Sequence, residues 1–156
     1  IRMSVPHSSP KIRLVEFLRQ SLAAKLLEAQ QSILTTQDSR DNETKSTSGD
    51  KYETGRAMVQ IELQKLADQR DKIDVQAQTL ARVDAQKHCT KVEFGSLVQT
   101  ENEQYFLAIG LGKIMFEGVA CYAISMDSPI GKVLKDKQAG DRVQFQGRAL
   151  TIVAID

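Results

Sequence analysis

Apolar residues in the first half of the chain recur at alternating steps of three and four positions. Two such series follow residues 11–37 and 59–83: Val15, Leu18, Leu22, Leu26, Ala29 and Ile33, then Val59, Leu63, Leu66, Ile73, Ala77, Leu80 and Val83. These steps form the heptad pattern of helices that pair along a narrow seam. Arg70 occupies one position of the second seam, and the remaining faces carry mostly polar helix-forming residues. The pattern predicts two long helices.

A polar segment separates the two series. Residues 38–50 contain no apolar side chain and are rich in Asp, Asn, Ser and Thr, which favour turns. Two helices of roughly 27 and 35 residues joined there would form an antiparallel hairpin with arms on the order of 40 to 50 Å. We predict a coiled-coil hairpin over residues 11–88 with an acidic tip near residues 38–53. A helix bundle is the less favoured alternative, because bundle helices carry a wider apolar stripe.

After Thr90 the chain changes to short, β-rich runs separated by glycines and polar pairs. The runs are Val92–Val98, Gln104–Ile109, Lys113–Phe116, Val119–Ser125, Arg142–Gln146 and Leu150–Ile155, and seven of the nine glycines fall among or beside them. Ser128 followed by Pro129 indicates the start of one short helix over residues 128–135. We therefore expect an α+β protein: a flexible start (residues 1–10), the helical hairpin, and a small antiparallel sheet domain over residues 90–156.

Composition narrows the functional classes. The chain has 156 residues and a formal net charge of +1, from 21 basic against 20 acidic residues, which argues against a nucleic-acid binder that works through bulk charge. No apolar run approaches the roughly 20 residues that span a bilayer, and residues 1–10 lack the apolar core of a secretory signal. Cys89 and Cys121 fit neither a disulfide framework nor a metal site, so we expect a reduced, cytoplasmic compartment.

The candidate chemistry lies at the predicted tip of the hairpin. Asp50 and Glu53 are three positions apart, so they share one face of the first helical turn. Acidic residues there also cap a helix, which is the simpler explanation for an arbitrary pair. At the end of a thin projection, however, two carboxylates are suited to deliver metal ligands into a narrow pore of another protein. The sheet domain offers no catalytic set, since no His follows His88 and Cys121 lies in an apolar run.

Three motifs resemble the bacterial Gre transcript-cleavage factors. Residues 124–134 read Ile-Ser-Met-Asp-Ser-Pro-Ile-Gly-Lys-Val-Leu and, with the Gly-Asp-Arg-Val of residues 140–143, look like the signature of the family's C-terminal domain. Residues 92–98 are similar to the opening strand of that domain. Residues 49–53, Gly-Asp-Lys-Tyr-Glu, resemble the family's tip motif. The resemblance covers about residues 11–156 and implies a coiled-coil hairpin followed by an FKBP-like domain.

The resemblance also implies a function and a partner. The C-terminal domain would dock on bacterial RNA polymerase at the rim of its secondary channel, and the hairpin would reach the active site through that channel. The docking residues would be Asp127, Ser128, Pro129, Ile130 and Gly131. At the tip, Asp50 and Glu53 would hold a Mg²⁺ shared with the polymerase and stimulate cleavage of backtracked transcripts, and Lys45, Lys51 and Arg56 would contact the RNA. The resemblance thus implies a protein that is not itself an enzyme and has no cofactor of its own, and we expect a monomer.

Departures from the family motif keep a second function open. Thr54 stands where the family has Asn, and Gly55, Arg56 and Ala57 follow in place of an acidic and aromatic pair. The alternative is therefore a secondary-channel modulator or inhibitor of RNA polymerase without cleavage activity. Two less favoured classes are a prolyl isomerase, which would need an aromatic-lined pocket, and an unrelated coiled-coil adaptor that pairs with a second chain.

Overall fold

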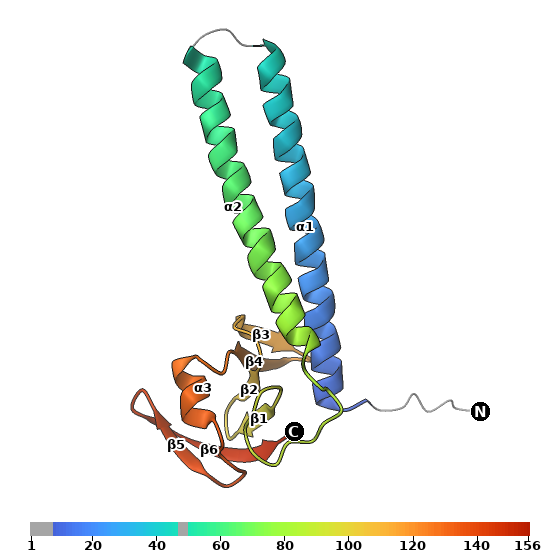
Figure 1. Cartoon of the computed structure of the whole chain (residues 1–156). Helices are drawn as coiled ribbons and strands as arrows, with labels where there is room; N and C mark the ends of the chain where they lie inside the picture. The colour runs from blue at the N-terminus through green and yellow to red at the C-terminus, as the bar shows by residue number, and fades with distance from the viewer. Residues whose placement is uncertain (1–7, 47–49) are drawn as a thin grey trace, which may run out of the picture. The chain divides into compact units, whose positions relative to one another are not determined.

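The structure is a computed structural model that describes residues 8–46 and 50–156 (Figure 1). For residues 43–46 and 50–52 it describes the backbone alone. Contacts divide the chain into two compact units. We call Arg19–Gln78 the helical unit, and the residues up to Leu18 together with Thr79–Asp156 the sheet unit. No helix among the described residues is long and apolar enough to cross a membrane.

Two long antiparallel helices confirm the predicted hairpin. They are α1 (Pro10–Ser46) and α2 (Asp50–Ala81), and they lie side by side through the helical unit (Figure 1). The start of α1 is capped by Ser9, whose Oγ accepts a hydrogen bond from the Ile12 amide at 3.3 Å, with Pro10 in the first helical position. Every residue of the two predicted seams is buried or partly buried, with Leu22, Ala29 and Leu63 buried within the helical unit.

The polar segment predicted as a turn is largely helical, which corrects the expectation that the first helix ends near residue 37. Helix α1 continues to Ser46. Residues 38–42 are exposed or partly exposed, and a helical turn that faces solvent needs no apolar residues. The hydroxyl of Ser39 bonds back to the preceding turn, where its Oγ donates to the Thr35 carbonyl at 3.2 Å. The centre of the predicted tip, residues 47–49, lies outside the described residues.

The sheet unit holds a six-stranded sheet and one short helix, as predicted for the second half of the chain. The strands are β1 (Leu97–Thr100), β2 (Gln104–Leu107), β3 (Gly112–Phe116), β4 (Val119–Ile124), β5 (Arg142–Phe145) and β6 (Arg148–Ile155), in the order β3-β4-β2-β1-β6-β5. Adjacent strands are antiparallel except β2 and β4, which run parallel. The expected antiparallel sheet is therefore confirmed with one parallel pair.

The first predicted strand begins later than expected. Residues 92–96 do not extend the sheet, and β1 starts at Leu97. A local turn replaces the strand because Ser96 Oγ accepts a hydrogen bond from the Glu93 amide at 2.9 Å, and the Ser96 amide donates to the Glu93 carbonyl at 3.0 Å. Gly95 has a φ of 89°, a left-handed conformation that other residues rarely adopt.

Helix α3 (Pro129–Leu134) packs on the sheet and completes the core. The core combines residues of the sheet and of α3 with Val92, which lies in the turn before β1. Its other members are Val98, Tyr105, Leu107, Ile130, Leu134, Val143, Leu150 and Ile152. The first turns of α1 belong to the same unit, where the buried Lys11 donates from Nζ to the Lys87 carbonyl at 2.7 Å. Phe17 and Phe116 also meet there, with ring centroids 5.3 Å apart.

Candidate functional site

The predicted docking loop is a tight turn that caps α3. Ser128 is the N-cap residue: its Oγ accepts a hydrogen bond from the Gly131 amide at 3.1 Å and donates to the Ser125 carbonyl at 2.7 Å. The Ser128 amide also donates to the Ser125 carbonyl, at 3.2 Å. Pro129 follows in the first helical turn, where its fixed φ and missing amide hydrogen suit the position. The Ser128 hydroxyl therefore links the Ser125 carbonyl of the loop to the Gly131 amide of the helix.

Close packing explains the glycine of this turn. A Cβ added to Gly131 would lie 2.3 Å from the Ser125 carbonyl oxygen, 2.9 Å from the Met126 carbonyl oxygen and 2.9 Å from Ser128 Oγ. Two of these three neighbours are backbone atoms, which a rotamer change cannot move. Gly131 is required here for space rather than for an unusual backbone angle.

The five predicted docking residues divide into an exposed and a buried set. Asp127 and Pro129 are exposed, and Ser128 is partly buried by its hydrogen bonds. Ile130 and Gly131 are buried, with Ile130 in the core. The turn can offer a partner one carboxylate and one proline ring, while the other three residues set its shape.

The predicted acidic tip is described only in part. Asp50 is the first residue of α2, and its side chain lies outside the description. Glu53 lies on the first turn of α2 with an exposed side chain. Among the described residues, no group of three or more His, Cys, Asp or Glu side chains could hold a metal ion.

The three basic residues expected to contact RNA lie on both helices near the same end of the helical unit. Lys45 is on the last turn of α1 and Lys51 on the first turn of α2, and both side chains fall outside the description. Arg56 is exposed on α2. The backbone thus brings all three to the end of the unit that carries Asp50 and Glu53, since the helices are antiparallel.

The apolar run around Cys121 places this residue in the interior of the sheet unit. It is fully buried on β4, and burial raises the pKa of its thiol to about 11. A protonated, inaccessible thiol is a poor nucleophile.

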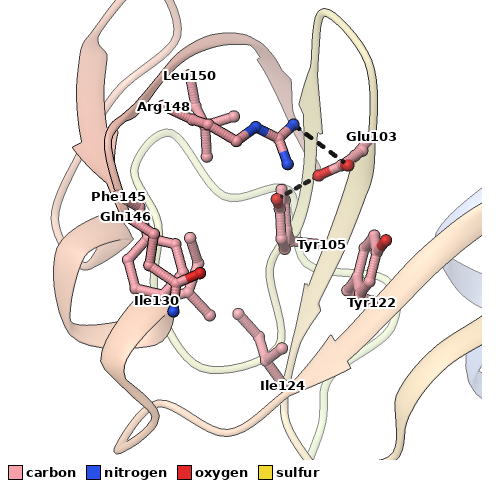
Figure 2. A pocket seen from close by; sticks show the side chains of 9 residues that line it. All are labelled: Glu103, Tyr105, Tyr122, Ile124, Ile130, Phe145, Gln146, Arg148 and Leu150. Atoms are coloured by element: carbon pink, nitrogen blue, oxygen red, sulfur yellow. Dashed lines mark hydrogen bonds and ion pairs between the residues drawn. The ribbon is translucent and has the colours of Figure 1, made fainter.

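The sheet unit contains a cavity of about 210 Å³ beside the capped turn (Figure 2). Its walls come from β2, β4, α3 and the β5–β6 hairpin, and its lining residues are Glu103, Tyr105, Tyr122, Ile124, Ile130, Phe145, Gln146, Arg148 and Leu150. Tyr105 and Tyr122 stack with ring centroids 5.6 Å apart. The parallel pairing of β2 and β4 places these two residues directly opposite each other.

One wall of this cavity is charged. Tyr105 Oη donates to Glu103 Oε2 at 2.5 Å, and Arg148 lies 3.5 Å from Glu103 Oε1 (Figure 2). Burial, and then the bond to Glu103, raises the pKa of Tyr105, so the phenol stays protonated and acts as the donor. The cavity therefore combines aromatic and aliphatic walls with a single carboxylate.

Sequence reasoning missed this cavity, although it named several of its residues for other reasons. Tyr105, Tyr122 and Phe145 fall within the predicted β-rich runs, and Ile124 and Ile130 within the loop motif. Glu103 and Arg148 carried no signal, because they are 45 positions apart and meet only through the pairing of distant strands. No spacing rule along the chain could have brought them together.

The solved structures that are similar to this chain include two transcription-factor structures. One is the GreA factor homolog 1 (Gfh1) of Thermus thermophilus, with 17% identity and a TM-score of 0.37 over 88% of this chain and 94% of that chain. Another is a structure described as the transcription factor Gfh1, with 18% identity and a TM-score of 0.35 over 88% and 92%. No family model and no curated protein matches the chain. At these TM-scores the likeness carries no functional argument, and the fold assignment rests on the helices and strands described above.

Proposed function

We propose that this chain is a Gre-type transcription elongation factor that binds bacterial RNA polymerase through the capped turn before α3. The observation that carries the proposal is the form of residues 125–131. The motif that resembles the family's docking loop is a hydrogen-bonded turn in which Asp127 and Pro129 are exposed. A turn fixed by its own hydrogen bonds loses little conformational entropy on binding.

The proposal assigns different roles to the residues of the turn. Asp127 and Pro129 contact the polymerase. Ser128 and Gly131 are positioning residues that maintain the loop, and Ile130 anchors it in the core. This division refines the sequence expectation, in which all five residues were binding residues.

We further propose that the hairpin, residues 11–88, enters the secondary channel and brings Asp50 and Glu53 to the polymerase active site. Carboxylate oxygens are the ligands that Mg²⁺ prefers, so the donor types fit this ion. A shared Mg²⁺ would supply the charge that stabilises attack of water on the transcript, and the chain would supply one or both carboxylates. Lys45, Lys51 and Arg56 would then lie near the extruded RNA.

A modulator that occupies the channel without stimulating cleavage is the second candidate. One observation favours it: Thr54 and Gly55 follow Glu53 within α2, in place of the family's Asn and acidic residue. A glycine inside a helix costs about 1 kcal/mol relative to alanine. The turn that presents the carboxylates is therefore intrinsically less rigid than one built from better helix formers.

The two candidates separate in a transcript-cleavage assay on a backtracked elongation complex. We expect the wild-type protein to accelerate cleavage, and the double variant Asp50→Asn, Glu53→Gln to bind the polymerase equally well without acceleration. A matched control is Glu62→Gln, which removes an exposed carboxylate two turns further along α2. Binding by the wild type with no acceleration would instead establish the modulator.

A further inference from the structure

The cavity beside the capped turn has the size of one side chain. Its volume of about 210 Å³ is below the roughly 300 to 1,000 Å³ of typical small-molecule clefts. A whole cofactor or a folded peptide segment would not fit. One long side chain would.

The chemistry of the walls indicates a cationic head on an apolar stem. Tyr105, Tyr122 and Phe145 provide aromatic surface, and the carboxylate of Glu103 lies at one end. A cation near an aromatic face is attracted by the ring quadrupole, and a nearby carboxylate adds direct charge attraction. A neutral apolar side chain would fill the same space but would gain nothing from the negative charge of Glu103.

The chain already places a cation at this end of the cavity, but holds it weakly. The guanidinium of Arg148 is 3.5 Å from Glu103 Oε1, which is long for a charged pair. The Arg148 side chain is 62% exposed and that of Glu103 only 20%. Because the contact is long and the arginine side is open to solvent, a better-placed cation can displace Arg148 from Glu103.

We propose that this cavity binds one basic side chain, arginine in preference to lysine, from a partner polypeptide. The stem of that side chain lies along Tyr105 and Tyr122, and its guanidinium replaces that of Arg148 on Glu103. Arginine is preferred because its planar group stacks on aromatic rings and binds a carboxylate through two parallel hydrogen bonds. The cavity adjoins the capped turn through Ile130, which lines the one and belongs to the other. That the side chain belongs to a partner polypeptide rests on the proposed function, whereas the preference of the cavity for a basic group does not.

The site can be tested without any polymerase by adding blocked amino acids to the isotope-labelled full chain. Changes in the amide chemical shifts of the chain then measure the binding. We expect N-acetyl-arginine methylamide to bind with a Kd of about 1 mM, as is typical for so small a ligand. The uncharged isostere N-acetyl-citrulline methylamide should bind at least tenfold more weakly, and the lysine analogue more weakly than arginine. Shifts should centre on the residues that line the cavity.

Two variants and one control sharpen the test. Glu103→Gln should weaken the arginine probe about tenfold, while Arg148→Ala should strengthen it about threefold by removing the internal competitor. Glu101→Gln removes an exposed carboxylate from the same β1–β2 turn and should change nothing. Retained dispersion of the amide spectrum shows that each variant is folded.

Several results would overturn the proposal. Equal binding of the citrulline and arginine probes, or tighter binding of the leucine or proline analogue, would make the cavity an apolar site. Tenfold tighter binding of agmatine or putrescine would identify a free amine as the ligand in place of a polypeptide. Failure of the chain to bind polymerase would refute the proposed function alone, since the probe measurements stand without it.

Discussion

The backbone carbonyl of Ser125 and the α-carbon of Gly131 approach so closely that a methyl group on Gly131 would lie 2.3 Å from the carbonyl oxygen. Real Cβ atoms do not occupy such positions. The same carbonyl accepts the hydroxyl of Ser128 at 2.7 Å, so it is fixed from two sides. The shape of the capped turn therefore depends on a missing side chain as much as on a hydrogen bond.

Gly131→Ala should destabilise the sheet unit by about 1 to 3 kcal/mol, the usual cost of an overpacked site. The measurement is chemical denaturation of the variant and wild type. Gly110→Ala is the control, because a Cβ there meets nothing within 4 Å and the backbone angle is unexceptional. Equal stability of Gly131→Ala and wild type would show that the turn relaxes easily and is not rigid.

Ser128→Ala should cost about 1 kcal/mol, the typical loss for an N-cap residue. The alanine leaves the Gly131 amide and the Ser125 carbonyl without the hydroxyl that joins them. Ser128→Thr keeps the hydroxyl and should recover most of the loss. Ser125→Ala is a control in the same turn, since it removes a side chain but keeps the carbonyl acceptor. A loss in Ser125→Ala as large as in Ser128→Ala would contradict the assigned role of Ser128.

Glu117→Gln should lower the melting temperature at pH 7, and this effect should vanish in acid. Arg13 donates to Glu117 at 2.7 Å and 3.1 Å, and these bonds hold the pKa of Glu117 below its ordinary value of 4.5. A carboxyl with a lowered folded-state pKa stabilises the fold above its unfolded pKa, and the contribution disappears as the pH falls through the folded value. Arg13 stays charged over this range.

The check is a series of melting curves of Glu117→Gln and wild type from pH 7 to pH 2.5. The two melting temperatures should converge below the ordinary carboxyl pKa. Glu101→Gln, which lacks an ion pair with Arg13, serves as the reference for a simple change of net charge. A constant difference between Glu117→Gln and wild type at every pH would assign the effect to packing, not to the ion pair.

The helices and most strands followed from the sequence because their signals are local. The spacing of three and four positions that includes Leu22 and Leu63 predicted the contact faces of the two long helices. Ser128 followed by Pro129 predicted the start of α3. Two errors came from polar residues. The polar residues after position 37 continue α1 to Ser46, and the hydroxyl of Ser96 turns the chain where a strand was expected.

The candidate site was predictable only where it is continuous in sequence. The proposed docking turn is a run of consecutive residues, so a motif could locate it, but the exposure of Asp127 and the burial of Ile130 depend on how α3 packs on the sheet. The cavity depends on strand register: Tyr105 meets Tyr122 because β2 and β4 are parallel, a pairing that no local pattern encodes.

Binding to purified bacterial core RNA polymerase, measured by biolayer interferometry with the full chain immobilised, tests the central claim most directly. The account predicts saturable binding by the wild type and by Asp50→Asn, Glu53→Gln. It predicts at least about tenfold weaker binding, or about 1.4 kcal/mol, by Asp127→Ala, Pro129→Ala. Lys135→Ala, an exposed change at the other end of α3, should bind as the wild type does. No binding by the wild type, or equal binding by Asp127→Ala, Pro129→Ala, would contradict it.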